Sequence, residues 1–125
     1  MSPETAVLLA GLHSIVLALF HVAFWKLFDW PAGYRGCSTA NRAIPQIANS
    51  CLIYLFAAVG ALCLLLPEDL LGTRLGRTVL AGMAGFWLVR TALQFVHLPY
   101  RHPAIHVLTA IFLLGAVLFA WPLLA

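Results

Sequence analysis

The stretch FWLVRTALQFVHLPYRHP, residues 86–103, combines a long apolar run with polar side chains at helical spacing. Arg90, Gln94 and His97 are spaced i, i+4 and i+7, so a helix places them on one narrow stripe. An ionisable side chain inside an apolar span is costly, and such a residue is a functional candidate by default. The stretch therefore predicts a membrane-spanning helix that carries part of a polar site.

The composition of the whole chain indicates a membrane protein. Of its 125 residues, 63% are hydrophobic and only 9% are charged, with a mean hydropathy of +0.98. A soluble domain carries about 25% charged residues, so this chain lacks the charge to cover a surface in water. The net charge of +3 does not favour nucleic acid as a partner, because the few basic residues lie at the ends of apolar runs.

Four apolar runs approach the roughly 20 residues that cross a bilayer, at 6–28, 45–66, 78–98 and 103–124. The first has no basic segment before it and no small-residue cleavage site after it, so we interpret it as a permanent helix. Pro45 is expected in the first turn of the second helix. The short connection at 98–102 predicts that the last two helices are antiparallel neighbours. We predict an all-α, integral membrane, four-transmembrane-helix up-down bundle that forms one domain over residues 1–125.

The basic residues also predict an orientation. Four lie in the first and third connections and two in the second: Lys26, Arg35, Arg42 and Arg101 against Arg74 and Arg77. Positive charge favours the cytoplasmic side. We therefore expect the first and third connections in the cytoplasm and both termini outside, in a membrane such as the bacterial inner membrane.

With this orientation, almost all polar side chains within the spans fall in the cytoplasmic leaflet. Each predicted helix supplies at least one of them: His21, Asn49, Arg90, Gln94, His97 and His106. The outer half contains only His13. This clustering predicts a polar pocket that binds, or helps to move, an amphipathic or anionic small molecule or lipid, with Arg90 as its charge partner. Alternatively, the amides only join helices, and Arg90 extends along its stem to the headgroups.

Several chemistries are disfavoured because no carboxylate lies within a predicted span. All four acidic residues fall in termini or connections: Glu4, Asp29, Glu68 and Asp69. A carboxylate-bridged di-iron site needs glutamates on inward-facing helices, and a proton-coupled exporter commonly uses a buried one. The three cysteines form no C-x-x-C pair, which disfavours a thiol oxidoreductase.

Haem or metal binding is the first alternative function, as part of a membrane redox subunit. His21 with His97 or His106 could ligate haem from different helices, and neutral imidazole also suits zinc or copper. The cofactor is otherwise unknown. The small size and small-residue faces also leave room for a homo-oligomer or a partner membrane subunit.

A small membrane enzyme is the second alternative. In size, number of spans and position of the polar site, the chain resembles the membrane-associated eicosanoid and glutathione metabolism family, which has an Arg-Ala-x-x-Asn-x-x-Glu pattern in its second helix. Here Arg42-Ala43 is followed by Asn49, at a different spacing, and Leu52 stands in place of the glutamate. Arg90 and Tyr100 correspond to Arg and Tyr residues near the end of the family's third helix. The resemblance implies a glutathione-transferase-like activity.

Overall fold

The computed structural model describes residues 1–98 and 102–125, and over these residues the chain is helical, without strands. The elements are α1 (Pro3–Val22), α2 (Phe24–Leu27), the 3₁₀ helix η1 (Ala32–Tyr34), α3 (Thr39–Leu65), α4 (Pro67–Gly72), α5 (Arg74–His97) and α6 (Pro103–Leu124). Four of them, α1, α3, α5 and α6, are long and apolar enough to cross a membrane. The predicted Pro99, Tyr100 and Arg101 connection lies outside the described residues.

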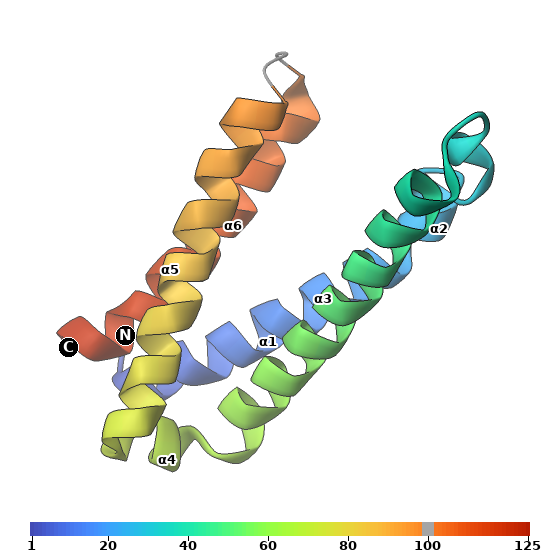
Figure 1. Cartoon of the computed structure of the whole chain (residues 1–125). Helices are drawn as coiled ribbons and strands as arrows, with labels where there is room; N and C mark the ends of the chain where they lie inside the picture. The colour runs from blue at the N-terminus through green and yellow to red at the C-terminus, as the bar shows by residue number, and fades with distance from the viewer. Residues whose placement is uncertain (99–101) are drawn as a thin grey trace.

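The long helices form two antiparallel hairpins, α1 with α3 and α5 with α6 (Figure 1). The hairpins meet near α4 and the two chain termini and diverge toward their other ends, so the molecule has the shape of a V. We call these the closed end and the open end. At the closed end, the Trp121 indole N–H donates to the Met1 carbonyl at 2.9 Å. Antiparallel pairing of the last two helices is confirmed, and the two hairpins pack together over only part of their length.

Aromatic rings hold the hairpins together where they meet. The Trp87 indole stacks between the rings of Phe56 and Phe112, with centroids 5.3 and 5.4 Å away, and only 1% of its surface is exposed. The His13 ring packs edge-on against the same indole at 5.3 Å. All four long helices therefore meet at Trp87. A Cβ on Gly115 would lie 2.6 Å from His13 and 2.9 Å from Trp87, so this close approach of α6 requires glycine.

The helix bounds differ from the predicted ones in the first two spans. The first apolar run, predicted to be continuous over 6–28, is interrupted at Ala23, where α1 gives way to the short α2. Helix α3 begins at Thr39, because the Ser38 hydroxyl caps it by accepting a hydrogen bond from the Asn41 N–H. The prediction that Pro45 opens this helix is wrong, since Pro45 lies inside it.

The second connection is also more helical than its polar sequence suggested. It contains α4, which starts with Pro67 at its first turn, and α5 begins at Arg74 rather than near residue 78. The Thr73 hydroxyl caps α5 by accepting from the Gly76 N–H. Polar residues end a hydropathy run, but they do not end a helix when a cap precedes them.

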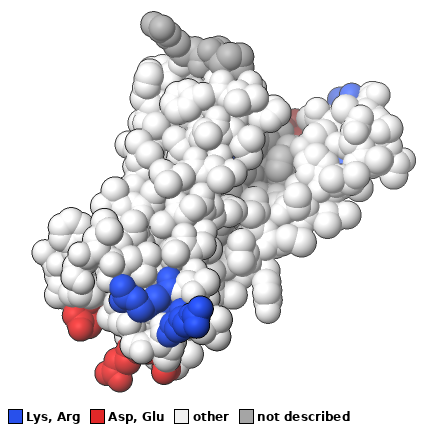
Figure 2. Space-filling model, turned by 60° about the vertical axis from the view of Figure 1, so that its left-hand side comes forward, with Lys and Arg blue, Asp and Glu red and all other residues white. Residues whose placement is uncertain are grey.

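The outer surface matches a lipid environment. Large apolar side chains on all four long helices are exposed, among them Val16 at 61% and Val96 at 69%. Figure 2 shows Lys, Arg, Asp and Glu gathered near the ends of the molecule, with uncharged surface between them. A surface so apolar is unsuited to water. The four apolar helices are compatible with a small membrane protein.

Candidate functional site

The two buried amides predicted for the pocket each join the helices of one hairpin. The Asn49 side-chain N–H donates to the His21 carbonyl at 2.9 Å, from α3 to α1. The Gln94 side-chain N–H donates to the Thr109 hydroxyl at 2.7 Å and to the Ile105 carbonyl at 3.2 Å, from α5 to α6. In the described structure their donors therefore serve helix pairing, which is the common role of amides within spans.

His21 and Arg90 lie on opposite hairpins, just beyond the aromatic stack toward the open end. The buried His21 ring donates through Nδ1 to the Leu17 carbonyl at 2.7 Å and packs against the Phe56 ring at 5.1 Å. The guanidinium carbon of Arg90 lies 4.6 Å from the centroid of the Phe112 ring. His21 and Arg90 thus contact the two rings, Phe56 and Phe112, that stack on Trp87. We call Arg90, His21, Phe56 and Phe112 the fork floor.

Arg90 has no ion pair or hydrogen bond from its side chain to any described residue. It is half-buried, and one face of its guanidinium is covered by the Phe112 ring in a cation–π contact. The N–H groups at its edge are the strongest donors in this region of the molecule, and an arginine at this position keeps its charge. Among the predicted site residues, Arg90 is the one best suited to attract an anion.

The two remaining predicted residues lie apart from the fork floor. His97 is the last residue of α5 and His106 lies near the start of α6, and both side chains are exposed. Among the described residues, no group of three or more His, Cys, Asp or Glu side chains is arranged to hold a metal ion. The structure therefore places His21 and Arg90 against the same aromatic stack, the amides within the hairpins, and these two histidines at the surface of the open end.

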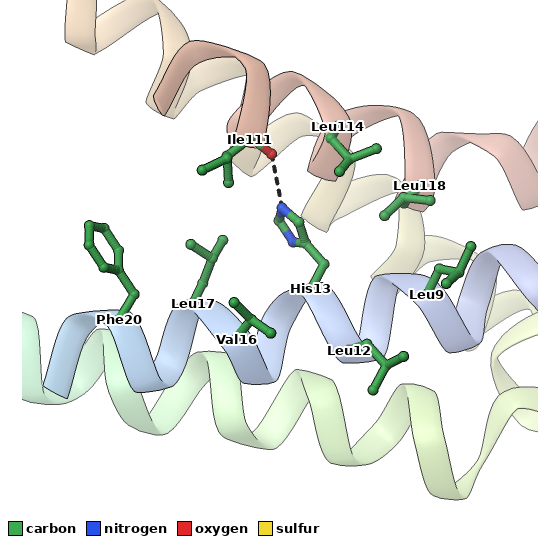
Figure 3. Close-up of a pocket in the computed structure, with 9 residues that line it drawn as sticks. All are labelled: Leu9, Leu12, His13, Val16, Leu17, Phe20, Ile111, Leu114 and Leu118. Atoms are coloured by element: carbon green, nitrogen blue, oxygen red, sulfur yellow. Dashed lines mark hydrogen bonds between the residues drawn. The ribbon is translucent and has the colours of Figure 1, made fainter. Parts of the chain in front are cut away.

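A groove lies between α1 and α6, around His13, and it was not predicted from the sequence because His13 is the one polar side chain of the outer half. The His13 Nε2–H donates to the Ile111 carbonyl at 2.9 Å and ties the two helices together (Figure 3). Around this bond lies a hollow of about 510 Å³. It is lined by Leu9, Leu12, His13, Val16, Leu17, Phe20, Ile111, Leu114 and Leu118. The signal in the sequence was the helical spacing of apolar residues around the one histidine of the outer half.

The groove continues toward the open end. A second hollow of about 760 Å³ shares Phe20 and Ile111 with the first and extends to Phe28 and Leu108. Both volumes are in the range of small-molecule sites, and both linings are predominantly apolar. Such a surface can hold a hydrocarbon chain.

The residues that carried the resemblance to the glutathione-metabolising family do not gather in the described structure. Arg42 is exposed near the start of α3, the Asn49 amide is bonded to the His21 carbonyl, and Tyr100 lies outside the described residues. Comparison of the chain with protein-family models, with curated proteins and with solved structures finds no match.

Proposed function

We propose that this protein binds an amphipathic anion, with the acidic group at Arg90 and the hydrocarbon chain in the groove between α1 and α6. The observation that carries the proposal is the position of Arg90. Its half-buried guanidinium lies over the Phe112 ring, and no described carboxylate pairs with it.

The energetics of a buried cation support this assignment. Insertion scales give a cost of about 2.5–3.5 kcal/mol for arginine at the centre of a span. The Phe112 ring offsets part of that cost, by roughly 0.5–2 kcal/mol. A bound carboxylate or phosphate would offset the remainder through charge-assisted, bidentate hydrogen bonds.

The groove supplies the matching apolar surface at the same depth. Ile111, which lines both hollows, precedes Phe112 in α6, and Phe20, which also lines both, precedes His21 in α1. On each helix the groove and the fork floor are therefore one residue apart, although no fork-floor residue lines either hollow. The proposal requires the ligand to pass from Arg90 around α6 or α1 into the groove. This combination favours an amphiphile over a small inorganic anion.

The orientation in the membrane is part of the proposal. The count of basic residues favours an open end in the cytoplasmic leaflet and termini outside, as in a bacterial inner membrane protein. An amphiphile from that leaflet would then enter between the hairpins. Such a protein would act as a carrier or as an accessory membrane subunit.

The test compares palmitate with hexadecanol, which has the same chain length without the charge. Melting temperatures are measured for purified protein in detergent. A ligand present at 100 times its Kd stabilises by about 2.7 kcal/mol. We expect palmitate to raise the melting temperature of the wild type well above the effect of hexadecanol.

Variants of Arg90 make this test specific. Arg90→Leu should retain the stability of the ligand-free protein, because it removes a charge from hydrocarbon, and should lose the extra effect of palmitate. Arg90→Lys keeps the charge without the planar donors and should show an intermediate effect. Arg74→Leu, at an exposed arginine of the closed end, is the matched control and should behave as wild type. Equal stabilisation of the wild type and Arg90→Leu by palmitate would refute the proposal.

A further inference from the structure

A separate cavity lies at the open end of the first hairpin, where the connection after α2 folds back onto the first turns of α3. Its volume is about 640 Å³. Arg35 and Arg42 both line it, with Thr39, Gln46 and the backbone around Pro31. No acidic residue is among those that line this cavity, so it carries two positive charges and no carboxylate.

Neither of these arginines is neutralised by its surroundings. Both side chains are exposed, and neither makes a hydrogen bond or an ion pair with a described residue. Two like charges that share a cavity repel each other unless an anion lies between them. Positive charge on a connection can set membrane topology, but topology does not require the charges to line one cavity.

The cavity is held in place by a hydrogen-bonded glutamine. The Gln46 side-chain oxygen accepts from the Trp25 indole N–H at 3.0 Å, and its N–H donates to the Arg42 carbonyl at 2.8 Å. Gln46 thereby fixes α2 to the start of α3. Because Gln46 also lines the cavity, these bonds define one wall of it.

Aromatic rings place this cavity at the level of lipid headgroups. The Trp25 ring packs edge-on against Trp30 at 5.5 Å, and Trp30 lies against Tyr34 at 5.6 Å. Tryptophan and tyrosine concentrate where the membrane meets water. The fork floor lies deeper, because Asn49 and Phe56 follow this segment along α3 toward the closed end.

We propose that Arg35 and Arg42 form a binding site for a phosphate group. Planar guanidinium groups match phosphate oxygens in a bidentate geometry, and two of them suit a doubly coordinated phosphate. The phosphate belongs either to an anionic lipid headgroup or to a soluble phosphate ester. This site is independent of the proposed role of Arg90.

The experiment uses the full-length protein carrying Arg90→Leu, so that the fork floor does not contribute. Binding is measured by titrating the protein with detergent micelles that contain phosphatidylglycerol or phosphatidylcholine, and separately with inorganic phosphate. Arg35→Gln/Arg42→Gln is compared with Lys26→Gln, a basic residue of the same end that does not line the cavity. Because Arg35, Arg42 and Lys26 are all exposed, these substitutions should leave the melting temperature of the ligand-free Arg90→Leu protein unchanged, which serves as the folding control.

We expect phosphatidylglycerol to bind at least tenfold more tightly than phosphatidylcholine, and the double variant to lose this preference while Lys26→Gln keeps it. Binding of inorganic phosphate with the same dependence on Arg35 and Arg42 would identify a soluble ligand. Binding of phosphatidylglycerol alone would identify a lipid headgroup. Absence of both, or an equal loss in Lys26→Gln, would overturn the proposal.

Discussion

The side-chain amide of Asn49 donates a hydrogen bond of 2.9 Å to the backbone carbonyl of His21, and this bond joins α3 to α1 near the open end. Asn49 is 4% exposed, so the bond is shielded from competing donors. The contact fixes the pairing of α1 with α3 in the first hairpin. Asn49 therefore has a structural role in helix pairing.

Asn49→Ala should destabilise the protein without changing affinity for palmitate. Interhelical hydrogen bonds within spans contribute about 0.6 kcal/mol on average and up to about 1.7 kcal/mol. Reversible unfolding in mixed detergent measures the change. Ser50→Ala is the control, because the Ser50 hydroxyl donates only to the Gln46 carbonyl within its own helix. Lost palmitate affinity at unchanged stability would instead assign Asn49 to the ligand.

Because Gly115 lies against His13 and Trp87, replacing it with alanine should lower the stability of the protein more than the same change at a glycine that has no neighbours. Gly115→Ala places a methyl group 2.6 Å from a ring carbon of His13, so the packing of the hairpins must shift. Overpacking of this kind typically costs about 1–3 kcal/mol. Gly82→Ala is the matched control, because nothing lies within 4 Å of its added Cβ.

In the same unfolding measurement, Gly82→Ala should be neutral or stabilising by up to about 1 kcal/mol, as expected for a helical glycine that meets no neighbour. If Gly115→Ala proved as harmless as Gly82→Ala, the close contact of α6 with α1 and α5 at the aromatic stack would be contradicted.

The orientation of the chain can be measured with its own cysteines. Cys37 is exposed in the connection before α3, whereas Cys63 is buried and Cys51 lies on an apolar helix. A membrane-impermeant thiol reagent applied to intact cells should leave Cys37 unlabelled, because the basic residues favour a cytoplasmic position for this connection. Permeabilised cells should label it, and Cys37→Ser should abolish that labelling. Labelling from outside would invert the orientation.

The helices were predictable from the sequence because hydropathy alone requires them, but their ends were not. The Ser38 and Thr73 hydroxyls start α3 and α5 before the apolar runs begin, and hydropathy does not register such local caps. The position of each polar residue along its apolar run gives its depth in the membrane, and depth alone predicted that Arg90 and His21 belong to a site. Depth does not reveal direction around a helix, so it grouped Asn49 and Gln94 with them although both bond within a hairpin.

The groove and its histidine were hidden for a related reason. His13 stood alone in an apolar half, and no pattern in the sequence shows that its Nε2–H reaches the Ile111 carbonyl from another helix. The angle between the hairpins is likewise set by packing at Trp87 and Gly115, between residues distant in the chain. Contacts of this kind depend on tertiary packing and are not encoded in local periodicity.

The V shape predicts that the open end changes its width on binding, whereas the closed end does not. A ligand that contacts both hairpins favours the conformation in which they approach, and it shifts the population toward that state. Spin labels on a cysteine-free background report the separation. The open-end pair is Ile47→Cys with Val96→Cys, and the closed-end pair is Leu65→Cys with Leu75→Cys, all at side chains more than 60% exposed.

Palmitate should shorten and narrow the distance distribution of the open-end pair and leave that of the closed-end pair unchanged. Arg90→Leu should remove the change, because it deletes the group that holds the acid between the hairpins. An open-end distribution that palmitate leaves unaltered, despite measurable binding, would show that the ligand occupies one hairpin alone.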